Sequence, residues 1–142
     1  MPQVNFYVLK QNQVAARLEF CARLAEKALQ NRMTVVCLLN DASEFEPLSN
    51  SLWQLRPEAF LPHTTSNEPH HPIALTAALS GAMAVAPEQS LLINLSRNLP
   101  TGHEPFARIA EVVIQAEPFL GNSRKLFSHY RKLGYQPVTH NV

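Results

Sequence analysis

The chain has 142 residues, of which 46% are hydrophobic and 16% charged, and its formal net charge is +1. This composition excludes a disordered polyelectrolyte, and the near-neutral charge excludes strong overall attraction to a nucleic-acid backbone. We expect a single domain over residues 1–142. The chain starts without a basic, apolar signal segment and has no apolar run of roughly 20 residues, so we expect a cytoplasmic protein without a membrane span.

Two apolar runs near the N-terminus, residues 4–9 and 33–39, predict buried strands. The segment between them, residues 12–30, predicts a helix, because its apolar residues recur at alternating steps of four and three. That stripe consists of Val14, Leu18, Cys21, Ala25 and Ala28. Strands that are apolar on both faces and flank a helix are typical of a parallel β-α-β unit.

A second helix is predicted over residues 42–53, with Asp41 or Ser43 able to cap its free N–H groups. Residues 64–72 predict a polar surface loop. Residues 77–85 stay unassigned, although their alanines taken alone would favour a helix. Apolar and β-branched runs predict the further strands at 73–75, 90–95, 109–114 and, as an edge strand beside Pro137, 135–139.

The last helix is predicted over residues 118–133, with Pro118 in its first turn and Gly134 at its C-terminal cap. Gly121 costs about 1 kcal/mol relative to alanine, so the firm part of this helix is expected to begin near Asn122. Together the elements predict a three-layer α/β domain with a mostly parallel sheet and helices on both faces.

The sequence carries no recognisable catalytic fingerprint. Its four glycines form neither a G-x-G-x-x-G turn nor a phosphate-binding loop, and no nucleophile elbow is present. His63, His70 and His71 are spaced too loosely for zinc and are interpreted as surface histidines. Cys21 and Cys37 are interpreted as small buried apolar residues. We therefore expect no cofactor, no metal and no catalytic residues.

Residues 51–63 combine large apolar side chains with stiff backbone. Trp53, Phe60 and Pro62 offer apolar area that loses little conformational entropy on binding, as a partner-binding anchor requires. In the alternative interpretation, Trp53 and Phe60 close one end of the core.

The last helix is the main concentration of positive charge, because no acidic residue lies between Pro118 and Val142. Arg124, Phe127 and Arg131 share one helix face. An aromatic ring between two guanidinium groups suits an acidic peptide with an apolar end, and it could also stack a nucleic-acid base. The alternative is a solvated basic face that stabilises the helix dipole, with Phe127 turned into the core.

Several short motifs resemble those of the chi subunit family of bacterial DNA polymerase III. They occur in the family's order along essentially the whole chain: Leu52-Trp53, Phe60-Leu61-Pro62-His63 and the segments 4–9, 91–96 and 130–135. The resemblance implies a Rossmann-like fold and a non-catalytic accessory subunit of the DNA polymerase III holoenzyme in DNA replication. Such a subunit bridges the clamp loader, through the psi subunit, to the acidic C-terminal tail of single-stranded DNA-binding protein, and contacts DNA only indirectly.

The resemblance also implies roles for individual residues. Trp53, Phe60 and Pro62 correspond to the psi-facing surface, which a repair helicase could also use. The residues that correspond to the tail-binding face are Arg124, Phe127, Ser128 and Arg131. The family often has a lysine where this chain has Ser128, and a basic residue where it has Leu120. The other functions considered are a nucleotide-binding α/β enzyme with an atypical phosphate loop and a direct binder of single-stranded nucleic acid.

Overall fold

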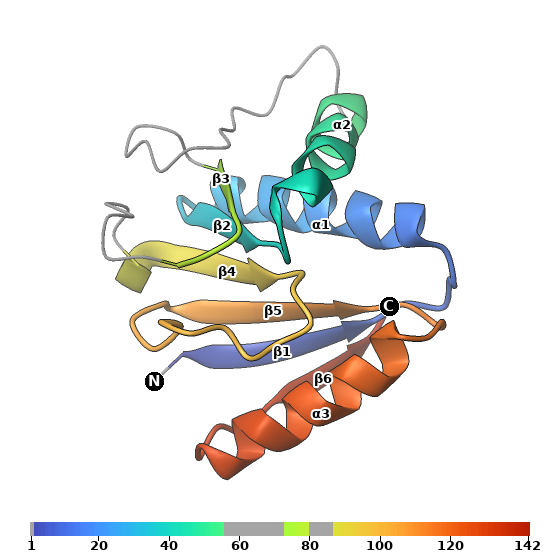
Figure 1. Cartoon of the computed structure of the whole chain (residues 1–142). Coiled ribbons are helices and arrows are strands. Elements are labelled where there is room, and N and C mark those ends of the chain that lie inside the picture. Colours follow the sequence, from blue (N-terminus) through green and yellow to red (C-terminus); the bar gives the residue numbers. More distant parts are fainter. Residues whose placement is uncertain (1, 56–72, 80–86) are drawn as a thin grey trace.

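The computed structural model describes residues 2–55, 73–79 and 87–142, with Trp53 and Leu55 described by their backbone alone. The described strands form one six-stranded parallel sheet in the order β3-β2-β4-β5-β1-β6 (Figure 1). Its strands are β1 (Gln3–Val8), β2 (Thr34–Leu38), β3 (Ile73–Thr76), β4 (Ser90–Asn94), β5 (Arg108–Val113) and β6 (Val138–Asn141). The helices are α1 (Val14–Gln30), α2 (Phe45–Leu55) and α3 (Phe119–Lys132), with short 3-10 helices η1 (Ala42–Glu44) and η3 (Pro87–Gln89).

The sheet lies between two helical layers. Figure 1 shows α1 and α2 on one side of the sheet and α3 on the other. Two apolar clusters match this division: in β2, Val35 and Cys37 pack with α1 and α2, whereas Val36 and Leu38 pack with α3. Because both faces are covered, the inner strands are apolar at successive positions rather than at alternate ones. This confirms the predicted three-layer α/β fold with a parallel sheet.

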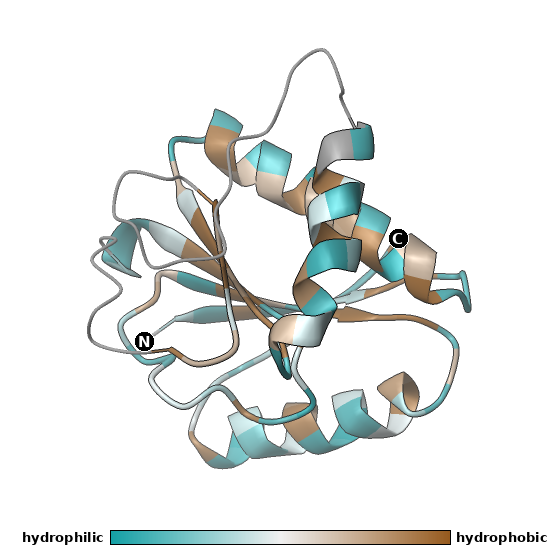
Figure 2. Cartoon of the chain, turned by 45° about the horizontal axis from the view of Figure 1, so that its top comes forward, coloured by the Kyte–Doolittle hydropathy of each residue, from teal (hydrophilic) through white to brown (hydrophobic). Residues whose placement is uncertain are grey.

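The helices are amphipathic, as covering a sheet requires. In Figure 2 the inner strands are largely hydrophobic, whereas each helix carries hydrophobic and hydrophilic residues side by side. Along α1, Cys21, Ala25 and Ala28 are buried as predicted, but Val14 is 51% exposed. Val14 is the first residue of the helix and is exposed, so this part of the predicted stripe is wrong.

The polar turn after β2 starts the second helical segment as predicted. The Asp41 side chain accepts a hydrogen bond from the backbone N–H of Ser43 and caps η1, which leads directly into α2. Helix α2 runs to Leu55, two residues further than predicted. The predicted loop at 64–72 and most of the ambiguous segment 77–85 lie outside the described residues.

The C-terminal elements differ in detail from their prediction. Helix α3 runs from Phe119 to Lys132, which confirms the helix predicted over 118–133 within one residue at each end. Only the expectation that its firm part begins near Asn122 is wrong, because the Glu117 side chain accepts a hydrogen bond from the Gly121 N–H at 2.8 Å and caps the first turn. The edge strand begins at Val138, after Pro137, rather than at Tyr135. Tyr135 instead lies in the helix cap and is buried. None of the described helices is long and apolar enough to cross a membrane.

Candidate protein-binding site on the last helix

The C-terminal end of α3 is closed by a glycine cap. Gly134 has a φ of +94°, in the left-handed region that glycine adopts without strain. The N–H of Gly134 donates to the carbonyl of Arg131 and the N–H of Tyr135 donates to that of Tyr130, both at 3.0 Å. These two bonds form a Schellman motif, which confirms the predicted role of Gly134.

The inward face of α3 fixes how the helix is rotated about its axis. Leu126 and Tyr130 are its buried residues, and Tyr130 is fully enclosed. The Tyr130 hydroxyl donates a hydrogen bond at 2.8 Å to Oε2 of Glu111 on β5. Asn94 on β4 donates to the same oxygen, also at 2.8 Å. This buried network, which the sequence did not indicate, ties the helix to two strands.

The network places a carboxyl group in the interior. Burial raises the pKa of Glu111 to about 8, although the hydrogen bonds from Asn94 and Tyr130 and the charge of Arg17 act in the opposite direction. Burial, and then the Glu111 charge, raise the pKa of Tyr130, so the hydroxyl keeps its proton and acts as donor.

The Arg17 side chain, which lies near this network, makes two contacts of its own. Its guanidinium lies 4.7 Å from the centre of the Phe119 ring and donates to the Val112 carbonyl at 3.0 Å.

The outward face of α3 contains an open hollow of about 430 Å³. The structure brings all four predicted tail-binding residues to this hollow and adds Lys132; we call it the α3 hollow. Its lining consists of Arg124, Phe127, Ser128, Arg131 and Lys132. Lys125, on the same helix, does not line it.

Phe127 takes an intermediate position between the two predicted alternatives. Its ring is half-buried and packs edge-on against Phe6 of β1, with the ring centres 5.3 Å apart. It also lines the α3 hollow, so the same ring faces both the core and the surface. The ring therefore forms a rigid apolar floor for the hollow.

The rim of the α3 hollow is positively charged. Arg124, Arg131 and Lys132 are exposed, and none of them forms an ion pair with a carboxylate in the described part of the chain. Arg131 and Lys132 lie in the last helical turn, where cations also stabilise the helix dipole. The hollow can thus attract an anion and bury an apolar group on the Phe127 ring.

The predicted psi-facing residues are only partly placed. The backbone of Trp53 lies in the last turn of α2, but its side chain is not among the parts that the structure describes. Phe60 and Pro62, with His63, His70 and His71, lie outside the described residues. Within residues 2–55, 73–79 and 87–142, no three His, Cys, Asp or Glu side chains are grouped closely enough to hold a metal ion.

Comparison with known proteins gives matches over nearly the whole chain. The family model described as DNA polymerase III chi subunit, HolC, matches residues 1–138. A protein of Pseudomonas aeruginosa named DNA polymerase III subunit chi is 34% identical, covering 100% of this chain and 98% of its own length. The protein of the same name from Haemophilus influenzae is 25% identical, covering 97% of this chain and 96% of its own length.

Proposed function

The chain belongs to the DNA polymerase III chi subunit family, and on that premise we propose that it is a non-catalytic accessory subunit of the holoenzyme. In this role it bridges the clamp loader, through the psi subunit, to the acidic C-terminal tail of single-stranded DNA-binding protein. The names of its relatives support a part in DNA polymerase III and in replication. The two contacts are proposals that follow from the resemblance and from the surface of α3.

The α3 hollow is the observation that supports the tail-binding part of the proposed function. A tail of this kind is acidic and ends in an apolar residue. Its carboxylates would lie against Arg124, Arg131 and Lys132, and its apolar end would lie on the Phe127 ring. The cations would steer the encounter, and burial of the apolar end would supply most of the affinity.

Calorimetric titration with a short acidic peptide ending in Ile-Pro-Phe tests this half. We expect saturable binding that weakens as salt rises and falls at least about tenfold in Arg124→Glu. Arg32→Glu is the matched control, because Arg32 is an exposed cation after the end of α1, outside the α3 hollow. Unchanged affinity in Arg124→Glu, or an equal loss of affinity in Arg32→Glu, would refute the placement of the peptide in the α3 hollow.

The psi-binding half depends on Trp53, Phe60 and Pro62. Large, rigid apolar side chains are typical anchors of protein interfaces. We expect Trp53→Ala to abolish capture of a psi subunit, or of a helicase that uses the same surface. Gln54→Ala is the control, since Gln54 is the exposed neighbour on α2. Capture that persists in Trp53→Ala would contradict this half and leave the tail-binding half untouched.

Direct binding of single-stranded nucleic acid is the second candidate, since the α3 hollow combines an aromatic ring with cations. It predicts affinity for arbitrary single strands, with no protein tail present, that falls steeply with salt. A net charge of +1 provides no broad basic surface to add to the hollow. The α3 hollow is a small, local site, and the acidic tail therefore fits it better than a nucleic-acid strand does.

A further inference from the structure

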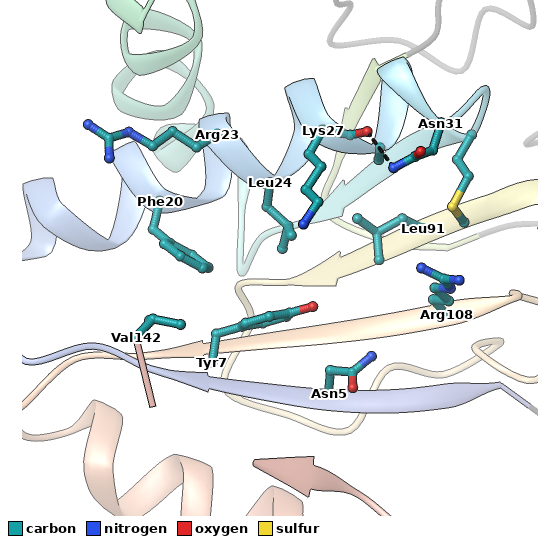
Figure 3. Close-up of a pocket in the computed structure, with 12 residues that line it drawn as sticks. Asn5, Tyr7, Phe20, Arg23, Leu24, Lys27, Asn31, Leu91, Arg108 and Val142 are labelled. Carbon is teal, nitrogen blue, oxygen red and sulfur yellow. Dashed lines mark hydrogen bonds between the residues drawn. The ribbon is translucent and has the colours of Figure 1, made fainter. Parts of the chain in front are cut away.

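A second cavity lies on the opposite side of the sheet from the α3 hollow. It has a volume of about 340 Å³ and is lined by residues of α1, β1, β4 and β5 and by the C-terminal Val142 (Figure 3). This volume is within the range of small-molecule sites. We call it the α1 pocket. Neither the family assignment nor the proposed tail and psi contacts uses it.

The α1 pocket exists because α1 does not cover the whole sheet face. The helix makes its main sheet contacts with β2 and β5. Strand β1 lies beyond β5, so its side chains that point to this face form a floor beside the helix. Asn5 and Tyr7 are these floor residues. The pocket is thus a consequence of the strand order and lies on well-defined elements.

One end of the α1 pocket is apolar and aromatic. The rings of Tyr7 and Phe20 lie 5.4 Å apart between β1 and α1. Leu24 lines the same part of the cavity and, in Figure 3, points into it. His140 of β6 stacks on Tyr7 at 5.1 Å and holds its ring in place. A flat or branched apolar group can therefore be buried here without rearranging the site.

The other end of the α1 pocket carries two cations on opposite walls. In Figure 3, Lys27 points in from α1 and Arg108 from β5, and the Tyr7 hydroxyl lies below the Lys27 amine in this view. Neither cation forms an ion pair with the described residues. Burial raises the pKa of the Tyr7 hydroxyl and the nearby Arg108 charge opposes this shift, so the phenol stays protonated as a donor.

Arg23 also lines the α1 pocket but plays a different part. Its guanidinium donates to Oε1 of Glu19 at 2.6 Å, one turn away on the helix. In Figure 3 its side chain points away from the cavity. Arg23 is therefore already neutralised, and the anion-binding end is formed by Lys27, Arg108 and the Tyr7 hydroxyl.

We propose that the α1 pocket binds a small amphipathic anion, in which one carboxylate or phosphate group is attached to an aromatic or branched apolar body. Arg108 offers a planar fork of donors that fits either anion, and Lys27 adds a compact charge from the opposite wall. The apolar body occupies the space between Tyr7, Phe20 and Leu24. Burial of that body supplies affinity, and the two cations select for the anion.

Titration of the isotopically labelled full chain by NMR tests the proposal with three probes of similar size: 3-phenylpropanoate, phenyl phosphate and the neutral 3-phenylpropanamide. We expect saturable shifts at Tyr7, Lys27 and Arg108 for at least one anion, and binding at least about tenfold weaker for the amide. The anion that binds more tightly shows whether the pocket prefers a carboxylate or a phosphate group. Equal binding of the amide, or no saturable shift with either anion, would overturn the proposal.

Variants with a matched control locate the anion. Lys27 and Arg108 are exposed, so Lys27→Gln and Arg108→Gln should fold normally, and each should weaken anion binding about tenfold. Arg23→Gln changes a cation one turn from Lys27 that is already paired, and should leave affinity unchanged. Equal losses in all three variants, or none in Lys27→Gln and Arg108→Gln, would contradict the assignment. Shifts confined to residues 124–132 would place the probe in the α3 hollow instead and would also contradict it.

Discussion

The Tyr130 hydroxyl donates a hydrogen bond to Oε2 of Glu111 across 2.8 Å in the buried layer between α3 and the sheet. The two residues are 19 positions apart in sequence and belong to the helix and the strand that it packs against. Since Arg131 follows Tyr130 directly, this bond sets the rotation of α3 that turns its basic residues outward. The surface proposed to bind a partner therefore depends on a polar contact inside the molecule.

Loss of the Tyr130 hydroxyl should destabilise the fold. Tyr130→Phe removes a donor from a buried carboxyl group, so we expect the free energy of unfolding to fall by about 1–3 kcal/mol. Urea unfolding measures this change. Tyr135→Phe is the matched control, because its hydroxyl has no hydrogen bond to the described residues and should change stability by less than about 0.5 kcal/mol. Similar losses in the two variants would contradict the role of the Tyr130–Glu111 bond.

Glu111 should make stability depend on pH. Burial raises its pKa from 4.5 to about 8, so between these values the native state holds a proton that the unfolded chain has lost. The contribution of Glu111 to stability should therefore be fully present below about pH 4.5, fall by up to about 1.4 kcal/mol per pH unit as pH rises toward about 8, and level off above it. Urea unfolding between about pH 5.5 and about pH 8.5 measures the slope.

Glu111→Gln isolates that contribution, because glutamine keeps the shape and an oxygen acceptor but does not titrate. All other titrating groups are common to both proteins, so the difference between the two slopes belongs to Glu111. We expect the variant to lose much of the decline with pH and to be the more stable protein at about pH 8.5. Parallel pH profiles would show that Glu111 is not a buried titrating group.

A lysine at position 128 should strengthen binding of the acidic tail. Ser128 lines the α3 hollow and is exposed, so Ser128→Lys adds a fourth cation without disturbing the core. We expect affinity to rise about two- to fivefold at low salt, with the gain lost as salt screens the charge. Ser128→Gln, which adds length without charge, should leave the affinity unchanged. A gain that persists at high salt would mean that the added contact is not electrostatic.

The two cysteines should be unreactive in the native protein. Cys21 and Cys37 are both buried, and burial raises both thiol pKa values, that of Cys21 to about 12. The reactive thiolate is therefore scarce and inaccessible. Ellman's reagent should label neither thiol without denaturant and both in urea. Rapid labelling of one thiol under native conditions would contradict its placement in the core.

The sequence predicted most of the fold because its strands are apolar on both faces and its helices have a single apolar stripe. Such patterns depend on local residue order alone. The helix α3 was predicted within one residue at each end, but its firm part was expected too late, near Asn122, because a propensity argument counted the cost of Gly121 but not the Glu117 side chain that caps it. The buried network was missed for a related reason: nothing in the run around Glu111 indicates that Asn94 and Tyr130 are its partners.

The candidate sites differ in how far the sequence could predict them. The α3 hollow is formed within one helix, so the spacing of Arg124, Phe127 and Arg131 was enough to bring them together. The α1 pocket joins residues from several elements, among them Tyr7, Lys27 and Arg108. Their proximity follows from the strand order of the sheet, which residue patterns do not determine.

The most direct test of the tail-binding proposal is to map the acidic peptide ending in Ile-Pro-Phe onto the isotopically labelled chain by NMR. We predict that the largest amide shifts lie within residues 124–132 and that the aromatic signals of Phe127 shift at the same peptide concentrations. Shifts concentrated at the α1 pocket, or no shifts in a folded sample at any peptide concentration, would contradict the claim that the α3 hollow receives the tail.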